Sequence, residues 1–430
     1  MTSRVPAPRL GLGSSDYEHI AQSLRPTDEL LARAYPGDDG SRQPVHTVYV
    51  PANTFTPDLP LEWGQLALAA VQGQDGLERL ASRLGLGEPE VLSSLVARKL
   101  SIEPVEDLRL DFEDGYGARP DDEEDADAAA AGLAVAAAAS AGSAPGFLGI
   151  RFKSLEAGTR ERGLRTLDLF LSALLAELKV HGLELPEGLT LTLPKVSTAA
   201  QVEAMVYVCG RLEEAHGLPA GRLRFEVQVE TPQVILGADG TAAVARLLHA
   251  ASGRVSGLHY GTYDYSAALG IAPEHQSLEH PAADYAKTVM QAAAAGTGVR
   301  LSDGSTNILP LGDAENMHRA WALHARLVAR SMTAGFYQGW DLHPHQLPTR
   351  FLATYAFYRS GFSAAASRLA SYATGREGTV LDEPATARAL ARFIQQAAAC
   401  GAVTEAELSA AGVPPEELNR LARTREPEHM

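Results

Sequence analysis

Cysteine is scarce in this sequence, and so are clusters of basic side chains. Only Cys209 and Cys400 occur among the 430 residues. Two cysteines cannot build a disulfide framework or a thiolate metal site, so a reducing compartment is the default. The formal net charge is −16, which argues against nucleic acid or an anionic membrane as a partner, because both need clustered lysine and arginine.

Long apolar runs are also missing. No stretch of about 20 strongly apolar residues occurs, as a membrane-spanning helix would require. The nearest approach, residues 126–141, is rich in weakly apolar alanine and follows the acidic residues 121–125. That combination predicts a soluble helix with acids at its N-terminus. The first eight residues lack the apolar stretch of a signal peptide, so we expect a cytoplasmic protein with no membrane partner.

The sequence does contain eight short segments rich in β-branched, leucine or aromatic residues, separated by segments of helical character. Most of the intervals are roughly 30–45 residues, which leaves room for one helix and its loops. Such alternation predicts parallel strands joined by crossover helices, and eight units fit a closed (β/α)8 TIM barrel, an α/β fold. A doubly wound open sheet is the competing fold. The predicted strands are 46–52, 108–114, 147–153, 190–196, 223–230, 255–261, 298–302 and 335–342.

The same pattern predicts how the chain is divided. Residues 1–45 form an N-terminal extension, 46–345 form the barrel with a helical insertion at about 53–107, and 346–430 form a C-terminal helical region. The polar segment 374–384 in that last region is either a lid over the site or a plain connector between helices. The helices expected there are 349–360, 362–372, 384–400, 404–411 and 414–424.

Charged residues gather at the predicted strand ends, which share one face of a closed barrel. Glu230 ends the fifth strand and Asp264 follows the sixth. Two carboxylates, with water and a substrate completing the shell, suit Mg²⁺, with Mn²⁺ as the alternative ion. The competing interpretation is that these acids cap helices or pair with arginine. Other charged or imidazole groups near the same face are Glu113, Asp114, Arg151, Lys195, Asp341, His343 and His345.

These residue types suggest a chemistry. A divalent cation can chelate a 2-oxo acid and stabilise an enolate formed beside the carbonyl. The guanidinium of Arg151 can bind a carboxylate or oxyanion bidentately, and we assign Lys195 and His343 to substrate binding as well. A Ser-His-Asp set, a P-loop and a GxGxxG motif following a strand are all missing from the sequence.

Several short motifs, taken in order, resemble the HpcH/HpaI aldolase and citrate lyase β-subunit family. Asp-Phe-Glu-Asp and Tyr-Asp-Tyr are also similar to the malate synthases, relatives on the same phosphoenolpyruvate/pyruvate-type barrel. The resemblance covers about residues 105–345 and extends into the tail. The motifs are Asp111-Phe-Glu-Asp114, Ile150-Arg151, Leu193-Pro-Lys-Val196, Val229-Glu-Thr-Pro232, Gly261-Thr-Tyr-Asp264 with Ala268-Leu-Gly270, and Gly339 to His343-Pro344.

The resemblance implies a Mg²⁺-dependent barrel that makes or breaks a carbon–carbon bond beside a carboxylate. By motif, Glu230 and Asp264 fall on the metal ligands and Arg151 on the arginine that binds substrate oxygens. Glu113 and Asp114 fall on the acidic pair that supports that arginine and the metal-bound waters.

The resemblance extends to the tail. Val380-Leu-Asp-Glu-Pro384 is similar to a tail element of the citrate lyase-like proteins. This makes Asp382 a candidate base, in its own or a neighbouring subunit of a homo-oligomer. The alternative role for Asp382 is a helix N-cap.

We therefore predict a Mg²⁺-dependent carbon–carbon lyase or aldolase acting on a 2-oxo acid, or on a hydroxy acid that cleaves to one. Two alternatives stay open: a citrate lyase-like or malate synthase-like enzyme using a CoA thioester, and a catalytically silent relative that binds a small carboxylate. The chain is longer than typical members, and it has Gly-Thr-Tyr-Asp where malate synthases have Gly-Arg-Trp-Asp. Few lysines or arginines lie near the predicted mouth, so a CoA pocket is not evident.

Overall fold

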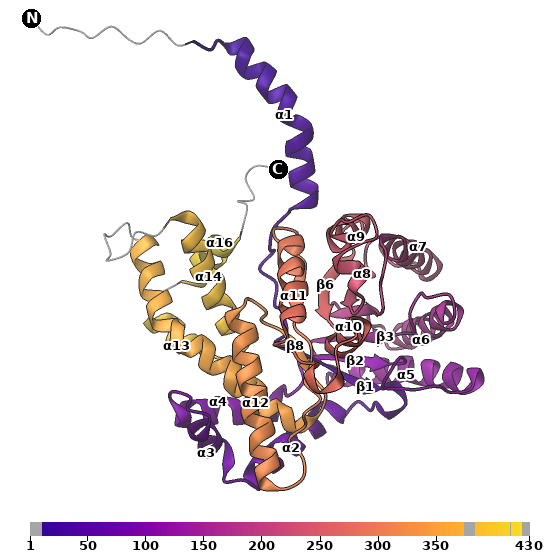
Figure 1. Cartoon of the computed structure of the whole chain (residues 1–430), viewed down its shortest axis with the longest axis vertical. Helices are drawn as coiled ribbons and strands as arrows, with labels where there is room; N and C mark the ends of the chain where they lie inside the picture. Colours follow the sequence, from indigo (N-terminus) through magenta and orange to yellow (C-terminus); the bar gives the residue numbers. More distant parts are fainter. Residues whose placement is uncertain (1–10, 374–382, 413, 424–430) are drawn as a thin grey trace, which may run out of the picture.

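Eight parallel strands form a nearly closed barrel in the computed structural model, which describes residues 11–373, 383–412 and 414–423 (Figure 1). The order β7-β6-β5-β4-β3-β2-β1-β8 follows the chain, so the predicted (β/α)8 fold is confirmed. β7 and β8 are joined by the bridge between Ser302 and Gln338. The strands are β1 His46–Pro51, β2 Asp107–Asp111, β3 Phe147–Arg151, β4 Leu189–Leu193, β5 Phe225–Val229, β6 Val255–Tyr260, β7 Arg300–Ser302 and β8 Gly339–Asp341.

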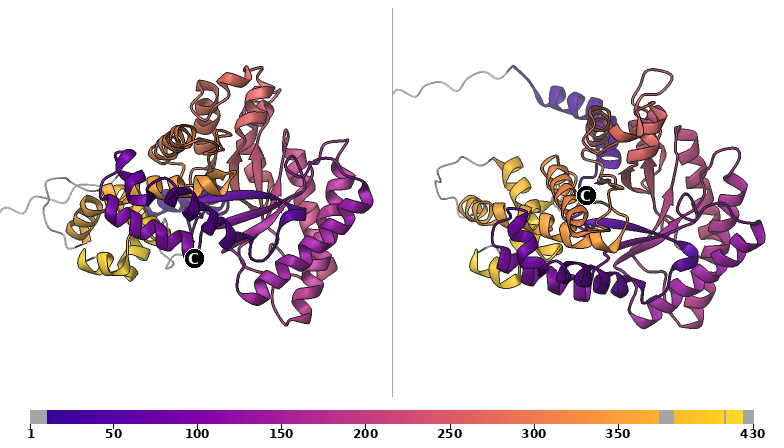
Figure 2. Two further views of the ribbon diagram at one scale, coloured as in Figure 1. Left: turned by 90° about the horizontal axis from the view of Figure 1, so that it is seen from below. Right: turned by 60° about the horizontal axis from the view of Figure 1, so that its bottom comes forward.

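Helices surround the strands on the outside of the barrel (Figure 2). Two short helices begin just beyond strand ends: α8 (Pro232–Ile235) after β5 and α10 (Thr262–Ala268) after β6. They position the residues that follow these strands at the mouth of the barrel. The longer crossover helices are α5 Asp121–Ala141, α6 Arg160–Val180, α7 Ala199–His216, α9 Ala243–Ala250, α11 Pro281–Ala294 and α12 Ala314–Thr333.

The predicted insertion after the first strand is helical, and so is the C-terminal region. The insertion contains α2 (Leu59–Gln72), α3 (Gly76–Arg83) and α4 (Pro89–Ile102). The C-terminal helices are α13 Leu347–Ala373, α14 Pro384–Ala399, α15 Glu405–Ala410 and α16 Pro415–Ala422.

One expectation about the tail is wrong: the two helices predicted at 349–360 and 362–372 are the single helix α13. Gly361, where the break was expected, lies inside it. A β-carbon at Gly361 would lie 2.8 Å from the Phe393 ring of α14. The glycine therefore serves close helix packing there and does not end the helix.

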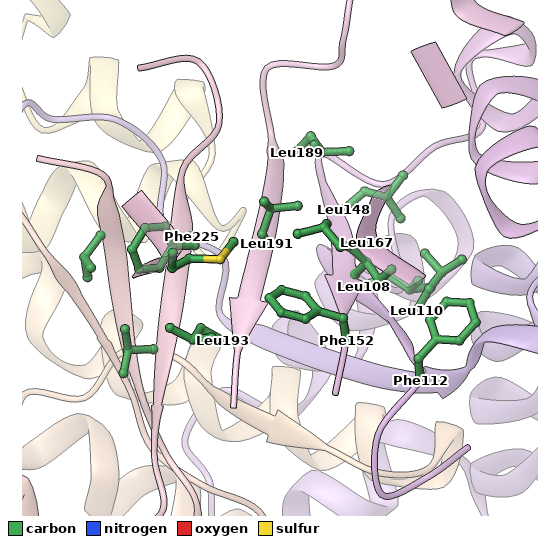
Figure 3. Packing of buried hydrophobic residues seen from close by; sticks show 14 of the residues in the cluster. Leu108, Leu110, Phe112, Leu148, Phe152, Leu167, Leu189, Leu191, Leu193 and Phe225 are labelled. Atoms are coloured by element: carbon green, nitrogen blue, oxygen red, sulfur yellow. The ribbon is translucent and has the colours of Figure 1, made fainter. Parts of the chain in front are cut away.

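Alternation along the strands separates an apolar outer face from a polar interior. Leu108 and Leu110 of β2 point outward and belong to the core between the sheet and its helices, with Leu148, Leu191 and Leu193 from neighbouring strands (Figure 3). The intervening β2 residues Asp107, Arg109 and Asp111 are also buried, but they belong to the polar set inside the barrel. TIM barrels are typically filled by branched apolar layers, so this interior is unusually charged.

Helix α1 (Ser14–Ala34) stands apart from the barrel (Figure 1) and contains no buried residue. Tyr35, just after it, contacts His249 edge-on at 5.4 Å between ring centroids. Within the part of the chain that the structure describes, no helix has both the length and the apolar character needed to cross a membrane.

Candidate functional site

The predicted ligands Glu230 and Asp264 are both at the carboxyl-end mouth of the barrel. Glu230 follows β5 directly, because the Thr231-Pro232 pair ends the strand and begins α8. Its side chain is buried, at 4% exposure. Asp264 lies in the first turn of α10, just past β6, and its side chain is 44% exposed.

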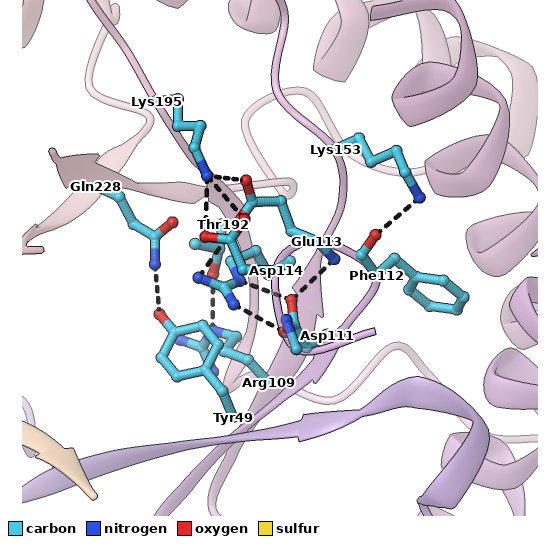
Figure 4. Close-up of polar contacts among 12 residues, drawn as sticks. Tyr49, Arg109, Asp111, Phe112, Glu113, Asp114, Lys153, Thr192, Lys195 and Gln228 are labelled. Atoms are coloured by element: carbon cyan, nitrogen blue, oxygen red, sulfur yellow. Dashed lines mark hydrogen bonds and ion pairs between the residues drawn. The ribbon is translucent and has the colours of Figure 1, made fainter. Parts of the chain in front are cut away.

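Lys195 connects four carboxylates at this mouth. It follows β4 with a left-handed backbone (φ 51°), and its amide N–H donates to Glu230 Oε2 at 3.0 Å. Its ammonium contacts Glu113 and, at 2.9 Å, Asp114 Oδ2 (Figure 4). It also lies 3.2 Å from Asp264 Oδ2. Burial opposes the charge on Lys195, but the neighbouring carboxylates outweigh it and raise the pKa above its ordinary value.

Negative charge at the site exceeds what Lys195 and Arg151 neutralise. Burial raises the pKa of Glu230 to about 8; Glu113 and Asp264 add to the rise, whereas Arg151 and Lys195 oppose it. Burial also raises the pKa of Glu113. The Oε2 atom of Glu113 is buried and accepts no hydrogen bond within the described residues. The cluster is therefore short of positive charge and of donors.

Arg151 is held at the edge of this cluster by a residue that motif reasoning did not select. Asp111 accepts from Arg151 Nε and Nη2, each at 2.7 Å, while Glu113 Oε2 is 3.4 Å from Nη1. The Arg151 guanidinium also lies 4.6 Å from the centre of the Tyr49 ring. The alternation of side chains along β2 could have identified Asp111, because a residue two positions beyond Arg109 faces the same side of the strand, the interior of the barrel.

Glu113 and Asp114, predicted as the acidic pair that supports Arg151 and the metal-bound waters, share these contacts with Asp111. Asp111 holds the arginine bidentately, whereas Glu113 contacts both Arg151 and Lys195. Asp114 is bonded to the Lys195 ammonium through both oxygens, at 3.0 and 2.9 Å. The acids that follow β2 thus hold Lys195 as well as Arg151.

The remaining predicted residues lie elsewhere or outside the described part. Asp341 is fully buried and paired with Arg350 at 2.9 Å and with His46 at 2.8 Å, so it is an internal ion-pair group. Nδ1 of His343 accepts from the His345 amide at 3.1 Å. Among the described residues, no hydrogen bond or ion pair joins His343 to the Lys195 cluster. Asp382 lies outside the described residues.

The donor set fits a hard divalent cation. Glu230 and Asp264 supply carboxylate oxygens at neighbouring strand ends, and burial together with the nearby acids Glu113 and Asp264 raises the pKa of Glu230, so a bound cation would favour its charged form. Mg²⁺ is commonly bound by one or two carboxylates, with waters and substrate oxygens completing its shell. Among residues 11–373, 383–412 and 414–423, no group of three or more His, Cys, Asp or Glu side chains could hold a metal ion by itself. This agrees with a shell that waters and substrate oxygens complete.

The protein is a (β/α)8 barrel with acidic residues at the carboxyl ends of its strands. Solved structures share this fold. A citrate lyase from Burkholderia xenovorans LB400 matches at a TM-score of 0.54 and 20% identity, covering 88% of this chain and 96% of that one. The predicted resemblance to the citrate lyase β-subunit family is thereby confirmed at the level of the fold. The chain itself belongs to the family described as "Domain of unknown function (DUF6986)", whose model matches residues 24–426.

Two further solved structures match with lower TM-scores. CitE from Mycobacterium tuberculosis, in complex with magnesium, acetoacetate and coenzyme A, has a TM-score of 0.47 and 17% identity, over 84% of this chain and 99% of that one. A malate synthase from Haloferax volcanii has a TM-score of 0.48 and 16% identity, over 73% and 76%. No curated protein matches the sequence.

Proposed function

We propose that this protein is a Mg²⁺-dependent carbon–carbon lyase that acts on a 2-oxo acid, or on a hydroxy acid that cleaves to one. One observation carries the proposal. Glu113, Asp114 and Asp264 contact the Lys195 ammonium, and Glu230 accepts from the Lys195 backbone amide, beside the guanidinium of Arg151. This arrangement suits a divalent cation, whose charge would offset the carboxylates and which would bind the oxygens of a small acid.

Glu230 and Asp264 would hold the ion, which when bound supplies a Lewis acid for the developing enolate oxygen. Arg151 orients the substrate. Asp111 occupies its Nε and Nη2 and so fixes the plane of the guanidinium, while Nη1 faces the cluster near Glu113. A fixed guanidinium binds a substrate carboxylate at a smaller entropic cost than a mobile one.

Lys195 and Glu113 set the charge of the site. The ammonium offsets the carboxylates before a ligand enters and can hydrogen-bond a substrate oxygen once they are occupied. Glu113 contacts both Lys195 and Arg151, so it fixes the spacing of the two cations. Both contributions are positional and electrostatic, which is typically where much catalytic power resides.

Proton transfer at carbon is assigned to Asp382, which comes from the tail motif and lies outside the described residues. We propose that the protein is a homo-oligomer in which Asp382 serves its own or a neighbouring subunit. Mixing Glu230→Ala with Asp382→Asn subunits separates the two cases. Recovered activity in the mixture means a shared site, and no recovery means that each subunit is self-contained.

Metal binding tests the site directly. Isothermal titration with Mg²⁺ and then with oxalate, an enolate mimic, is expected to show binding of both by the wild type and of neither by Glu230→Ala. A wild type that binds neither ligand contradicts the proposal.

Turnover tests the reaction. A panel of 2-oxo and hydroxy acids, assayed with and without coenzyme A esters, is expected to give turnover without coenzyme A. Turnover only with the esters favours a citrate lyase-like or malate synthase-like reaction. Binding without any turnover favours a silent carboxylate binder.

A further inference from the structure

A second cavity, of about 470 Å³, opens at the opposite, amino-end mouth of the barrel. Arg222 and Arg224 precede β5, and Arg300 begins β7. All three line the cavity, whose floor is formed by Arg109, Glu226 and His259 inside the barrel. The volume is in the range of ordinary small-molecule sites.

The charged groups of this floor pair with one another. Arg109 pairs with Glu226 at 2.8 Å and with Asp107. Trp340 Nε1, which can only donate, bonds His259 Nδ1 at 3.1 Å, and His259 Nε2 is 3.0 Å from Glu226. His259 is therefore neutral with its proton on Nε2. These buried groups hydrogen-bond or pair with one another and leave none of the three rim arginines a partner.

The rim is different, because its three guanidiniums have no carboxylate partner within ion-pair distance among the described residues. Arg222 bonds only the carbonyl oxygens of Leu185 and Pro186, at 2.8 and 2.5 Å. Arg300 bonds the Ser41 hydroxyl at 2.6 Å and lies over the Phe147 ring. Arg224 is exposed, and the described part of the chain offers it no hydrogen-bond partner.

Two acids, Asp39 and Glu187, also line the rim, but neither pairs with these arginines. Asp39 is engaged by the amide and hydroxyl of Ser41, at 2.8 and 2.5 Å, and Glu187 is exposed. Burial lowers the pKa of Arg300 and of Arg222; for Arg300 the nearby charge of Arg224 contributes, although Asp39 opposes it. In a chain of net charge −16, three arginines gathered around one cavity without an ion-pair partner among the described residues are a specific feature.

From these contacts we infer that the amino-end cavity binds a small oxyanion carrying two or more negative charges, of the phosphate or di- and tricarboxylate class. Guanidinium groups bind such oxygens through paired N–H donors. Gly257 lines the cavity beside the floor, where a β-carbon would lie 3.3 Å from His259 Nε2. The site is at the far end of the barrel from Glu230 and does not depend on the proposed lyase chemistry.

The experiment is isothermal titration of the full chain, with inorganic phosphate and citrate as separate probes, in the presence of saturating Mg²⁺ and oxalate to occupy the carboxyl-end mouth. The wild type is expected to bind at least one probe with one site per chain. The double variant Arg224→Gln/Arg300→Gln is expected to bind it at least tenfold more weakly. Its melting temperature without ligand is expected to stay near that of the wild type, because neither arginine is in an ion pair.

A matched control removes two other surface arginines. Arg211 and Arg246 pair with Glu214 and Asp239, away from the cavity, and Arg211→Gln/Arg246→Gln changes the net charge equally. This control is expected to keep wild-type affinity. Binding of phosphate alone assigns a phosphate-bearing ligand, and binding of citrate alone assigns a polycarboxylate. No binding of either probe at millimolar concentration, or equal weakening in the control, overturns the proposal.

The two sites can fail separately. The Arg224→Gln/Arg300→Gln variant is expected to keep the Mg²⁺ and oxalate titrations of the wild type, and Glu230→Ala is expected to keep the oxyanion titration in Mg²⁺-free buffer. Loss of the oxyanion titration in Glu230→Ala would place the bound anion at the carboxyl-end mouth and overturn the amino-end site.

Discussion

Gly261 packs directly against the side chain of Glu230. A β-carbon on Gly261 would lie 2.3 Å from Glu230 Cγ and 2.9 Å from Oε1, closer than side chains approach one another. The backbone of Gly261 is extended, with φ −99°, so the glycine is needed for space and not for a left-handed conformation. The residue that follows β6 therefore determines where the carboxylate that follows β5 can lie.

Gly261→Ala is expected to displace Glu230 and weaken Mg²⁺ binding at least tenfold, with a loss of about 1–3 kcal/mol in the free energy of unfolding from overpacking. Isothermal titration and urea unfolding measure the two effects. Gly210→Ala is the control, because that helical glycine has open space around its β-carbon position. Unchanged Mg²⁺ affinity in Gly261→Ala would show that Glu230 is not a ligand.

Asp264→Asn is expected to lose Mg²⁺ affinity while the melting temperature of the metal-free protein changes little. The carboxylate is 44% exposed and its ion pair is with the Lys195 ammonium at 3.2 Å, and such half-exposed pairs contribute little stability. Titration calorimetry and thermal unfolding check both parts. A large drop in the metal-free melting temperature would instead make Asp264 a structural residue.

Lys195→Met is expected to raise Mg²⁺ affinity at least tenfold, by about 1.4 kcal/mol, and to weaken substrate binding. The ammonium contacts the same carboxylates that a divalent ion would use, so metal and lysine compete for them. Titration of Mg²⁺ and then oxalate separates the two effects. Lower Mg²⁺ affinity in this variant would mean that Lys195 organises the ligands and does not compete with the ion.

Asp341→Asn is expected to destabilise the protein at neutral pH and much less in acid. Burial alone would raise the pKa of Asp341, but Arg350 and two histidines hold it well below its ordinary value. A depressed folded-state pKa stabilises the fold above the unfolded-state value and loses that effect as pH falls toward the folded one.

Asp341→Asn is therefore expected to lower the free energy of unfolding by about 3–5 kcal/mol at pH 7. This loss is expected to become smaller below roughly pH 4. Urea unfolding at pH 7 and pH 3 measures it. Asp168→Asn, on the exposed face of α6, is the control and is expected to show no such trend. A deficit that is equal at both pH values contradicts the assigned charge state.

Much of the fold was predictable because its signals are local. Strand β5 is the apolar run that ends before Thr231-Pro232, and the Thr-Pro pair sets its boundary. The same reasoning located Glu230 and Asp264 at one mouth, because parallel strand ends share a face. Helix α13 was predicted in two parts because Gly361 is a breaker by propensity, while its packing partner Phe393 is more than 30 residues away in sequence.

The pairing of charges was harder to predict because it depends on contacts between distant segments. Asp341 is at a strand end like Glu230, yet Arg350 and His46 occupy it. Asp111 and Glu113 belong to the same motif, and the register of β2 against β3, which puts Asp111 opposite Arg151, decides that Asp111 holds the arginine. Sequence position indicates which mouth an acid faces, but not which cation neutralises it there.

The seam between β7 and β8 has a consequence for how the barrel opens. Each of these strands has three residues, and besides the Ser302–Gln338 bridge the seam is held by the Asp303 amide on the Gln338 carbonyl at 2.8 Å and the Trp340 amide on the Gly304 carbonyl at 3.3 Å. Because so few hydrogen bonds join β7 to β8, separating these two strands is expected to cost little free energy. Amide protons along it are expected to exchange with solvent faster than those between β2 and β3, which five residue pairs join.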